Sequence, residues 1–386
     1  MTGLSPQIKP LPLSLPLGFI AVGSVDLLVG VWLLALHPQA LLSYRHPITL
    51  AVAHLLFLGF GVGVLMGVMQ QLVAVILEGP LAKPHWGYAT LLLWGLGTPL
   101  QVGGFLSQNS SQLALGGGLG FLGLLVFALH MLLTFRQAER WNPVATALAW
   151  VMFYLVLTPL LGMLQALSLR YGFYDPNRLA WHAVAGLAGV FLLSIWGVGH
   201  KLVEMFTLSH GGNTKWLGLE LWALNLGLLG LAWGQRLGVA LLVLGIGIAG
   251  YDLLNLLRHR NKRVLDVGVQ HFLAGAGFLL LALGAFVFQR YWLAGLWFGL
   301  GFVGLIVTGM LYKITPFLIW THRYAPLVGR TRVPLLKEML PEWTPRLAGG
   351  LLGVGALLIP FAPPAAWLLV GGVGFFIYTL VEVMRR

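Results

Sequence analysis

Twelve apolar runs follow one another along the chain, and only short polar segments separate them. A helix needs about 20 apolar residues to cross the hydrocarbon core of a bilayer, which is close to the length of each run. Because lipid cannot satisfy backbone N–H and C=O groups, such runs are expected to be helical. The runs cover residues 14–36, 47–77, 84–106, 112–135, 142–169, 178–207, 214–234, 236–257, 264–288, 291–321, 345–361 and 364–384. They predict an all-α fold: a polytopic membrane bundle of about 12 transmembrane helices, in a single transmembrane domain over residues 1–386.

The composition excludes most soluble classes of protein. Of the 386 residues, 58% are hydrophobic and 9% are charged, whereas a soluble domain has roughly a quarter of its residues charged. The formal charge of +12 resides mainly in the short loops, which is typical of membrane topology signals. We therefore expect the lipid bilayer as a partner and no nucleic acid. The first run is long enough to span and lacks the features of a cleaved signal peptide, so we expect it to be retained.

The basic residues indicate the orientation in the membrane. With the runs threaded alternately through a bilayer, seventeen Lys and Arg residues fall on one side and five on the other. Positive residues concentrate in cytoplasmic loops, so both termini and the longest loop are predicted to be cytoplasmic. The chain is expected to be a multi-pass protein of the inner (cytoplasmic) membrane of a prokaryote. Three runs, 47–77, 178–207 and 291–321, exceed the length of a span and are expected to tilt or protrude.

Three of the runs contain segments that align without gaps. The segments are His54–Ile76 (HLLFLGFGVGVLMGVMQQLVAVI), Val184–Phe206 (VAGLAGVFLLSIWGVGHKLVEMF) and Leu296–Leu318 (LWFGLGFVGLIVTGMLYKITPFL). Glycine coincides at two aligned positions, Gly59/Gly189/Gly301 and Gly67/Gly197/Gly309. With 52 glycines in the chain, chance coincidence is the alternative, but the even spacing of four spans favours a repeat. We predict repeats of about 14–135, 142–257 and 264–384, arranged as three four-helix arcs with pseudo-threefold symmetry.

This organisation resembles subunit I of the heme-copper oxidase and nitric oxide reductase superfamily, and the chain looks like a divergent, oxidase-like relative. The likeness consists of twelve spans, internal termini, three four-helix arcs and a His in the outer part of the second span. At the level of residues it is carried by HLLFLGFGVGVLMGVMQQL, WHAVAGLAGVFLLSIWGVGHKLVEMF and GMLYKITPFLIWTHRY. The resemblance implies a heme-binding membrane protein with heme b as its cofactor.

The resemblance assigns His54 as an axial ligand of a low-spin heme. In the family, the partner ligand and the ligand of a second heme come from the tenth span, which here has no His before His322. The family's copper is held by a His on the sixth span, where His182 lies, and by a His pair on the seventh span, which has no His here. The heme–copper centre therefore cannot be assembled in the family's way. We expect neither copper nor conventional terminal-oxidase activity.

The residues themselves leave a second interpretation of both histidines open. The chain has no cysteine, so any heme or metal must be held by His, Met, Tyr or carboxylate groups. His54 and His182 lie in the outer third of their spans, ~10 Å and ~6 Å deep at 1.5 Å per residue. Neutral imidazole is a good axial ligand of heme iron. The alternative is that each ring donates one hydrogen bond to a backbone carbonyl between helices.

Further candidates lie toward the inner side of the membrane. His130, His200 and His271 are predicted there and are candidate metal ligands. His200 and Glu204 are four residues apart and share a helix face, where they could bind a metal or a proton. The interpretation that we favour pairs Lys201 with Glu204 near the headgroups and leaves His200 facing water.

Asp26 stands near the middle of the first span, about twelve residues from either end. A carboxylate at that depth is costly and is by default a functional candidate, here for a proton path or as the partner of a histidine. The alternative is a protonated acid that is hydrogen-bonded to a neighbouring backbone group.

These observations leave three functions open. The leading one is a heme-binding, oxidase-like integral membrane protein that transfers electrons or handles nitric oxide, oxygen or heme, with a redox partner or another membrane subunit. If it is an enzyme, we expect a heme-dependent oxidoreductase and not a conventional terminal oxidase. The alternatives are a proton-coupled transporter of metal or heme, which would use Asp26 and the histidines, and a cofactor-free accessory subunit.

Overall fold

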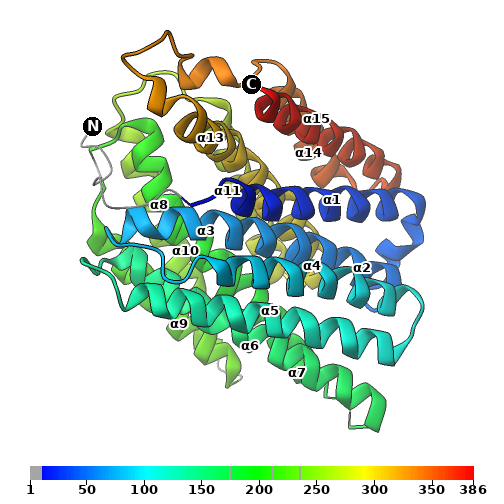
Figure 1. Ribbon diagram of the computed structural model, residues 1–386. Coiled ribbons are helices and arrows are strands. Elements are labelled where there is room, and N and C mark those ends of the chain that lie inside the picture. Colours follow the sequence, from blue (N-terminus) through cyan, green and yellow to red (C-terminus); the bar gives the residue numbers. More distant parts are fainter. Residues whose placement is uncertain (1–10, 174, 211, 234–235) are drawn as a thin grey trace. The chain divides into compact units, whose positions relative to one another are not determined.

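The computed structural model describes residues 11–386 apart from 174, 211 and 234–235. Its regular structure there is helical (Figure 1). One isolated β-bridge joins Ser209 and Arg260. Nine of the predicted spans are single α-helices: α1 (Ser14–Leu36), α4 (His85–Leu106), α5 (Ser110–Phe135), α6 (Pro143–Tyr171), α9 (Thr214–Ala232), α10 (Arg236–Arg258), α11 (Val267–Val287), α14 (Thr344–Leu358) and α15 (Ala366–Arg385).

The other three spans are composite, because a π-helix interrupts each α-helix. The first joins α2 (Pro47–His54), the π-helix η2 (Leu55–Val62) and α3 (Gly63–Ile76). The second joins α7 (Pro176–Val184), η3 (Ala185–Leu192) and α8 (Leu193–Thr207). The third joins α12 (Tyr291–Leu296), η4 (Trp297–Val303) and α13 (Gly304–Arg323).

Each predicted run thus corresponds to a helical segment. Within the described residues, ten of these segments are long and apolar enough to cross a membrane. Of the other two, α14 is a shorter apolar helix, and α9 carries the polar residues Glu220 and Asn225. The predicted all-α, polytopic membrane fold is confirmed.

The chain forms two compact units. The first includes the residues up to Gln71, together with Thr98–Asn109 and Asp266–Arg386, and the second comprises Leu72–Gly97 and Ser110–Leu265. In the first unit, α1 packs against η2 and α15, and α11 packs against η4 and α13. In the second unit, α6 packs against α5, η3 and α8, and α9 packs along α10.

The three π-helices occur at the aligned positions of the three similar segments. The residues that precede them, His54, Val184 and Leu296, are the first residues of the alignment. A π-helix has i→i+5 hydrogen bonds and therefore takes more residues per turn than an α-helix. The three π-helices lie in the three runs that are longer than a span requires, so they account for part of that extra length. Because π-helical turns often mark functional sites, these segments are also of interest for function.

The aligned glycines make equivalent contacts with the long helix that precedes each composite span. A Cβ added at any of them would overlap a side chain of that helix. At the first position the contacts are Gly59 with Asp26, Gly189 with Tyr154, and Gly301 with Phe278. At the second they are Gly67 with Phe19, Gly197 with Ala147, and Gly309 with His271. The three aligned segments therefore fold and pack alike, while the larger four-helix repeats stay a prediction.

The contact at Gly301 yields a test of this packing. A methyl group at Gly301 would run into the ring of Phe278, so Gly301→Ala should lower the free energy of unfolding by about 1–3 kcal/mol through overpacking. A Cβ at Gly295, on the preceding turn, meets no atom within 4 Å. Gly295→Ala is therefore the matched control and should leave stability unchanged or slightly raised. Thermal unfolding in detergent micelles compares the two, and equal stabilities would contradict the tight contact.

Candidate functional site

Three ionisable side chains from three helices of the second unit gather in its interior. They are His200 on α8, Glu220 on α9 and Asp252 on α10, and we call them the acid–histidine cluster. Their residues are 7%, 2% and 4% exposed, respectively. Each lies roughly 10 Å along its helix from the nearer end, at 1.5 Å per residue. The cluster is thus well inside the helical layer and away from the helix ends.

Glycines bring α9 and α10 into close backbone contact and so position the two acids. A Cβ at Gly227 would overlap Leu242, and one at Gly245 would overlap Leu224. Glu220 lies seven residues before Gly227, and Asp252 lies seven residues after Gly245. Seven residues are two helical turns, so each acid lies on the same face as the glycine that contacts the partner helix. Both carboxylates therefore project into the interior.

A direct hydrogen bond joins Nδ1 of His200 to Oδ2 of Asp252. The other carboxylate oxygen of Asp252, Oδ1, is buried without a hydrogen-bond partner, and so is Oε1 of Glu220. Glu220 and Asp252 are close enough to interact electrostatically. An apolar interior disfavours two neighbouring carboxylate charges. The cluster therefore places two acids and a histidine together at a cost in free energy.

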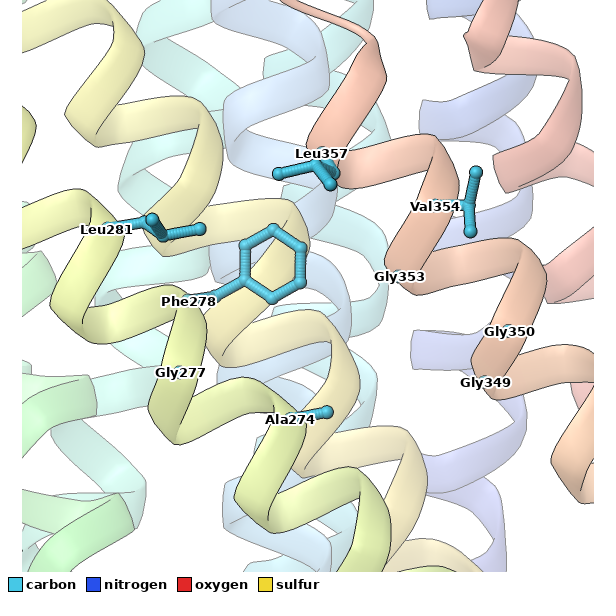
Figure 2. A pocket seen from close by; sticks show the side chains of 9 residues that line it. All are labelled: Ala274, Gly277, Phe278, Leu281, Gly349, Gly350, Gly353, Val354 and Leu357. Carbon is cyan, nitrogen blue, oxygen red and sulfur yellow. The ribbon is translucent and has the colours of Figure 1, made fainter.

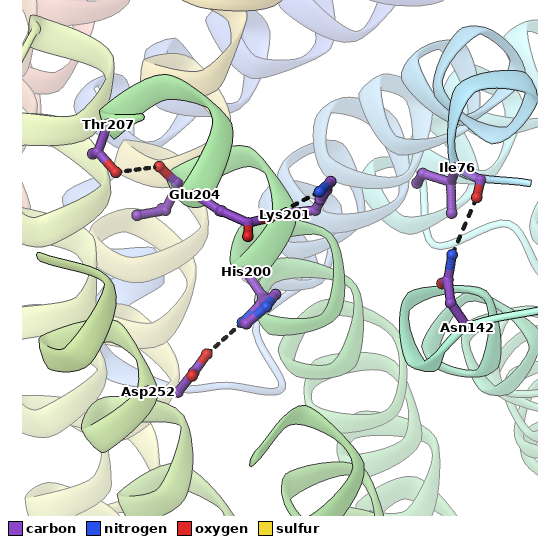
Figure 3. A network of polar contacts seen from close by, with 8 residues as sticks. Ile76, Asn142, His200, Lys201, Glu204, Thr207 and Asp252 are labelled. Carbon is purple, nitrogen blue, oxygen red and sulfur yellow. Dashed lines mark hydrogen bonds and ion pairs between the residues drawn. The ribbon is translucent and has the colours of Figure 1, made fainter. Parts of the chain in front are cut away.

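The outer face of α8 differs from this interior. Lys201 Nζ donates to Glu204 Oε2 at 2.8 Å, and both groups are much more accessible than the cluster. Figure 3 shows His200 pointing to Asp252, whereas Lys201 and Glu204 interact with each other along the helix. The predicted pairing of Lys201 with Glu204 is confirmed. The prediction that His200 faces water is wrong, because Asp252 on another helix binds its ring in the interior.

Glu220 is a site residue that the sequence analysis missed. It stands in the apolar run 214–234 (TKWLGLELWALNLGLLGLA in α9) as the single acid of that helix. The signal that singled out Asp26, a carboxylate within an apolar run, applies equally to Glu220.

Asp26 in the first unit is buried, with 8% exposure. Its carboxylate lies against Gly59 of η2, and its Oδ2 atom has no hydrogen-bond partner. The equivalent positions at the other two π-helices hold aromatic side chains, Tyr154 and Phe278. Packing against the π-helix therefore does not require a carboxylate, and Asp26 stays a candidate functional residue.

The two proposed heme ligands each bind a backbone carbonyl through Nδ1. His54 contacts Leu50 O at 2.7 Å, one turn earlier on the same helix, and its ring packs on Phe105 at 4.7 Å between centroids. His182 contacts Thr158 O of α6 at 2.8 Å and lies against Gly162. Both side chains are half-buried. The alternative to heme ligation, a hydrogen bond from the ring to a backbone carbonyl, thus applies to Nδ1 of each ring.

The remaining candidate histidines, His130 and His271, also bind carbonyl groups. His130 Nε2 lies 2.5 Å from Ala82 O, and the Thr134 hydroxyl accepts a hydrogen bond from the N–H of Ala82. Together they fix the loop before α4. His271 Nε2 lies 3.1 Å from Pro345 O, and its ring meets Tyr312 edge-to-face. Among the residues that the structure describes, no three His, Asp or Glu side chains converge in a metal-binding arrangement.

No protein-family model matches the chain, and no curated protein matches it.

The hydrogen bond between His200 and Asp252 yields a quantitative test. His200→Ala leaves a buried carboxylate without its partner and should lower the free energy of unfolding by about 1–3 kcal/mol. The double variant His200→Ala/Asp252→Ala should recover part of that loss, because neither group is then left alone. Thermal unfolding in detergent measures the coupling between the two positions.

Lys201→Ala serves as the control for this cycle, because an exposed ion pair contributes at most about 1 kcal/mol. Strictly additive losses in the double variant would show that His200 and Asp252 do not stabilise each other.

Proposed function

We propose that this chain is a proton-coupled membrane transporter in which the acid–histidine cluster takes up and releases the coupling protons. The observation that carries the proposal is the burial of His200, Glu220 and Asp252 together in one helical unit. Ionisable groups inside a membrane protein are costly and generally mark ion or proton pathways. A bundle that needed only packing would fill these positions with apolar side chains.

The geometry supports a proton relay with defined roles. His200 Nδ1 and Asp252 Oδ2 hold one proton between them, and Oδ1 of Asp252 and Oε1 of Glu220 are further acceptors. Because the two carboxylates interact, protonating Glu220 weakens the repulsion on Asp252 and changes its hold on His200. A proton that enters the cluster thus affects side chains on three helices, α8, α9 and α10. Asp26 would provide a separate proton site in the first unit.

Metal ions are the substrate class that we propose, because proton release can balance the uptake of a cation; heme is the alternative substrate. The cluster supplies the proton side of this exchange, and the proposal places no metal within it. Carboxylate and imidazole groups elsewhere in the chain would then contact the substrate during transport.

A flux assay tests the proposed role of Glu220. In proteoliposomes loaded with a pH-sensitive dye, an inward gradient of Mn²⁺ or Zn²⁺ should drive proton efflux through the wild-type protein. Glu220→Gln keeps the shape but cannot ionise, so efflux should fall roughly tenfold or more, the usual effect of losing a proton-transfer group. Glu204→Gln, which alters an accessible acid on the neighbouring helix α8, is the matched control and should retain wild-type flux.

Equal flux in the Glu220→Gln and wild-type proteins would exclude the cluster from the coupling step. Absence of metal-driven proton movement in the wild-type protein, together with none driven by heme, would exclude the transporter.

A second function, heme binding in an oxidase-like protein, is favoured by the hydrogen bond that orients the ring of His54. Hydrogen bonding of Nδ1 to Leu50 O sets the tautomer in which Nε2 carries the lone pair, as is usual for metal-binding histidines. The π-helices at the aligned positions further support a functional role for the segment that begins at His54. The residues present thus fit one axial ligand, and heme b, when bound, would supply one-electron chemistry. His182 is the second candidate ligand.

The visible spectrum tests this second function. If the purified protein carries heme, His54→Ala should lose it or convert it from a six-coordinate to a five-coordinate form, seen as loss of the sharp low-spin bands. His46→Ala, which replaces the histidine that caps α2, is the control and should keep the spectrum. An unchanged low-spin spectrum in His54→Ala would remove His54 as a ligand, and a colourless wild-type protein would contradict heme binding.

A further inference from the structure

An apolar groove runs between α11 and α14 of the first unit, with a volume of about 580 Å³. Its lining is apolar throughout and includes Ala274, Gly277 and Leu281 on α11 and Gly350, Gly353 and Leu357 on α14. Figure 2 shows the ring of Phe278 between the two helices, with bare glycine backbone on both sides of the space. The groove is therefore a hollow on an apolar surface, and no polar side chain lines it.

The groove follows one face of each helix. On both helices the lining residues recur at spacings of three and four, from Ala274 to Leu281 and from Gly350 to Leu357, which is the period of a helical stripe. The hydrogen-bond contact between His271 and Pro345 O places the beginnings of α11 and α14 side by side. The two stripes therefore run in the same direction. We call the end of the groove at the beginnings of α11 and α14 its first end.

Three of the four glycines of the groove do not serve packing between helices of the described chain; the fourth, Gly349, packs against the ring of His271. A Cβ at Gly277 or Gly350 would meet no atom within 4 Å, and one at Gly353 would meet only Leu305 at 4.0 Å. By contrast, a Cβ at Gly355, on another face of α14, would overlap Leu369 of α15. A glycine inside a helix costs about 1 kcal/mol relative to alanine. Three such residues around one open space indicate a hollow shaped for an occupant.

The dimensions of the groove favour a lipid chain over a helix. The lined stretch of seven to eight residues is ~12 Å long at 1.5 Å per residue. The volume then gives a cross-section of ~50 Å², whereas a helix 10 Å wide has a cross-section of ~80 Å². A flexible hydrocarbon chain is narrower than a helix and fills such a hollow without distortion.

The first end of the groove carries a positive charge. Arg346 is exposed and lies four residues before Gly350, on the stripe of α14 that lines the groove. Glu342, one turn earlier, forms no ion pair with it in the described part of the chain. The N-terminus of α14, which has no side-chain cap, lies at the same end, and helix N-termini favour anions. A cation at the mouth of an apolar groove is complementary to an anionic lipid.

We propose that the groove between α11 and α14 binds one anionic phospholipid, with an acyl chain along the glycines and its phosphate at Arg346. The lipid replaces the side chains that these glycines lack, and it supplies the negative charge that Arg346 does not receive from the protein.

Native mass spectrometry of the full-length protein tests the proposal, with phosphatidylglycerol as the anionic probe and phosphatidylcholine as the neutral one. From mixed detergent micelles, the wild-type protein should retain one phosphatidylglycerol and bind phosphatidylcholine roughly tenfold more weakly, because the choline cation of phosphatidylcholine offsets the charge of its phosphate near Arg346. Gly350→Leu fills the groove from α14 and Gly277→Leu fills it from α11, and each should abolish retention. Arg346→Gln should remove the preference between the two lipids.

Gly374→Leu is the matched control, since a Cβ at this exposed glycine of α15 also meets no atom within 4 Å. It should retain phosphatidylglycerol as the wild-type protein does, and thermal unfolding confirms that each variant is folded. Retention by both groove-filled variants would overturn the proposed position of the lipid. Equal binding of the two lipids by the wild-type protein would overturn the role of Arg346. Conversion of a dimer to a monomer by Gly350→Leu, with no change in lipid binding, would assign the groove to a second copy of this chain.

Discussion

Contact between a side chain and a glycine backbone is the interaction on which this architecture depends. Lipid offers no hydrophobic drive for helices to associate, so close van der Waals packing must hold them together. Each of α1, α6 and α11 places two side chains against glycines of the composite span that follows it. These contacts also determine where chemistry is available, because Asp26 and His271 occupy contact positions that aromatic or small side chains fill in the equivalent segments.

The acid–histidine cluster, unlike the glycine contacts, costs stability. Burial of His200, Glu220 and Asp252 removes them from water, and one hydrogen bond between His200 and Asp252 offsets only part of that cost. The close packing of α9 on α10 at their glycines offsets the rest of the cost of burial and keeps the acids in place. Stability at this site therefore comes from the surrounding apolar packing.

The local sequence predicted the helices well, and it predicted the interior groups poorly. Length and hydropathy determine where a span such as Ser14–Leu36 begins and ends, because lipid imposes the same demand on every residue of it. Which residue His200 meets depends on the rotation of α10 about its axis, and Asp252 is 52 residues away. The depth of Asp26 was readable from sequence, but its contact with Gly59 required the packing of two helices. The π-helices were not predicted, because the apolar pattern continues unbroken through them.

The π-helices have a consequence for the register between neighbouring helices. The two glycines of each composite span are eight residues apart, whereas the residues they contact on the partner helix are seven apart, as with Gly59 and Gly67 against Asp26 and Phe19. Seven residues of an α-helix return to nearly the same side, but the eighth adds about 100° of rotation. The wider π-helical turn absorbs that additional residue. Each composite span is thus equivalent to a straight α-helix with one residue inserted between its two glycines. Without the π-helix, this insertion would turn the two glycines toward different neighbouring helices.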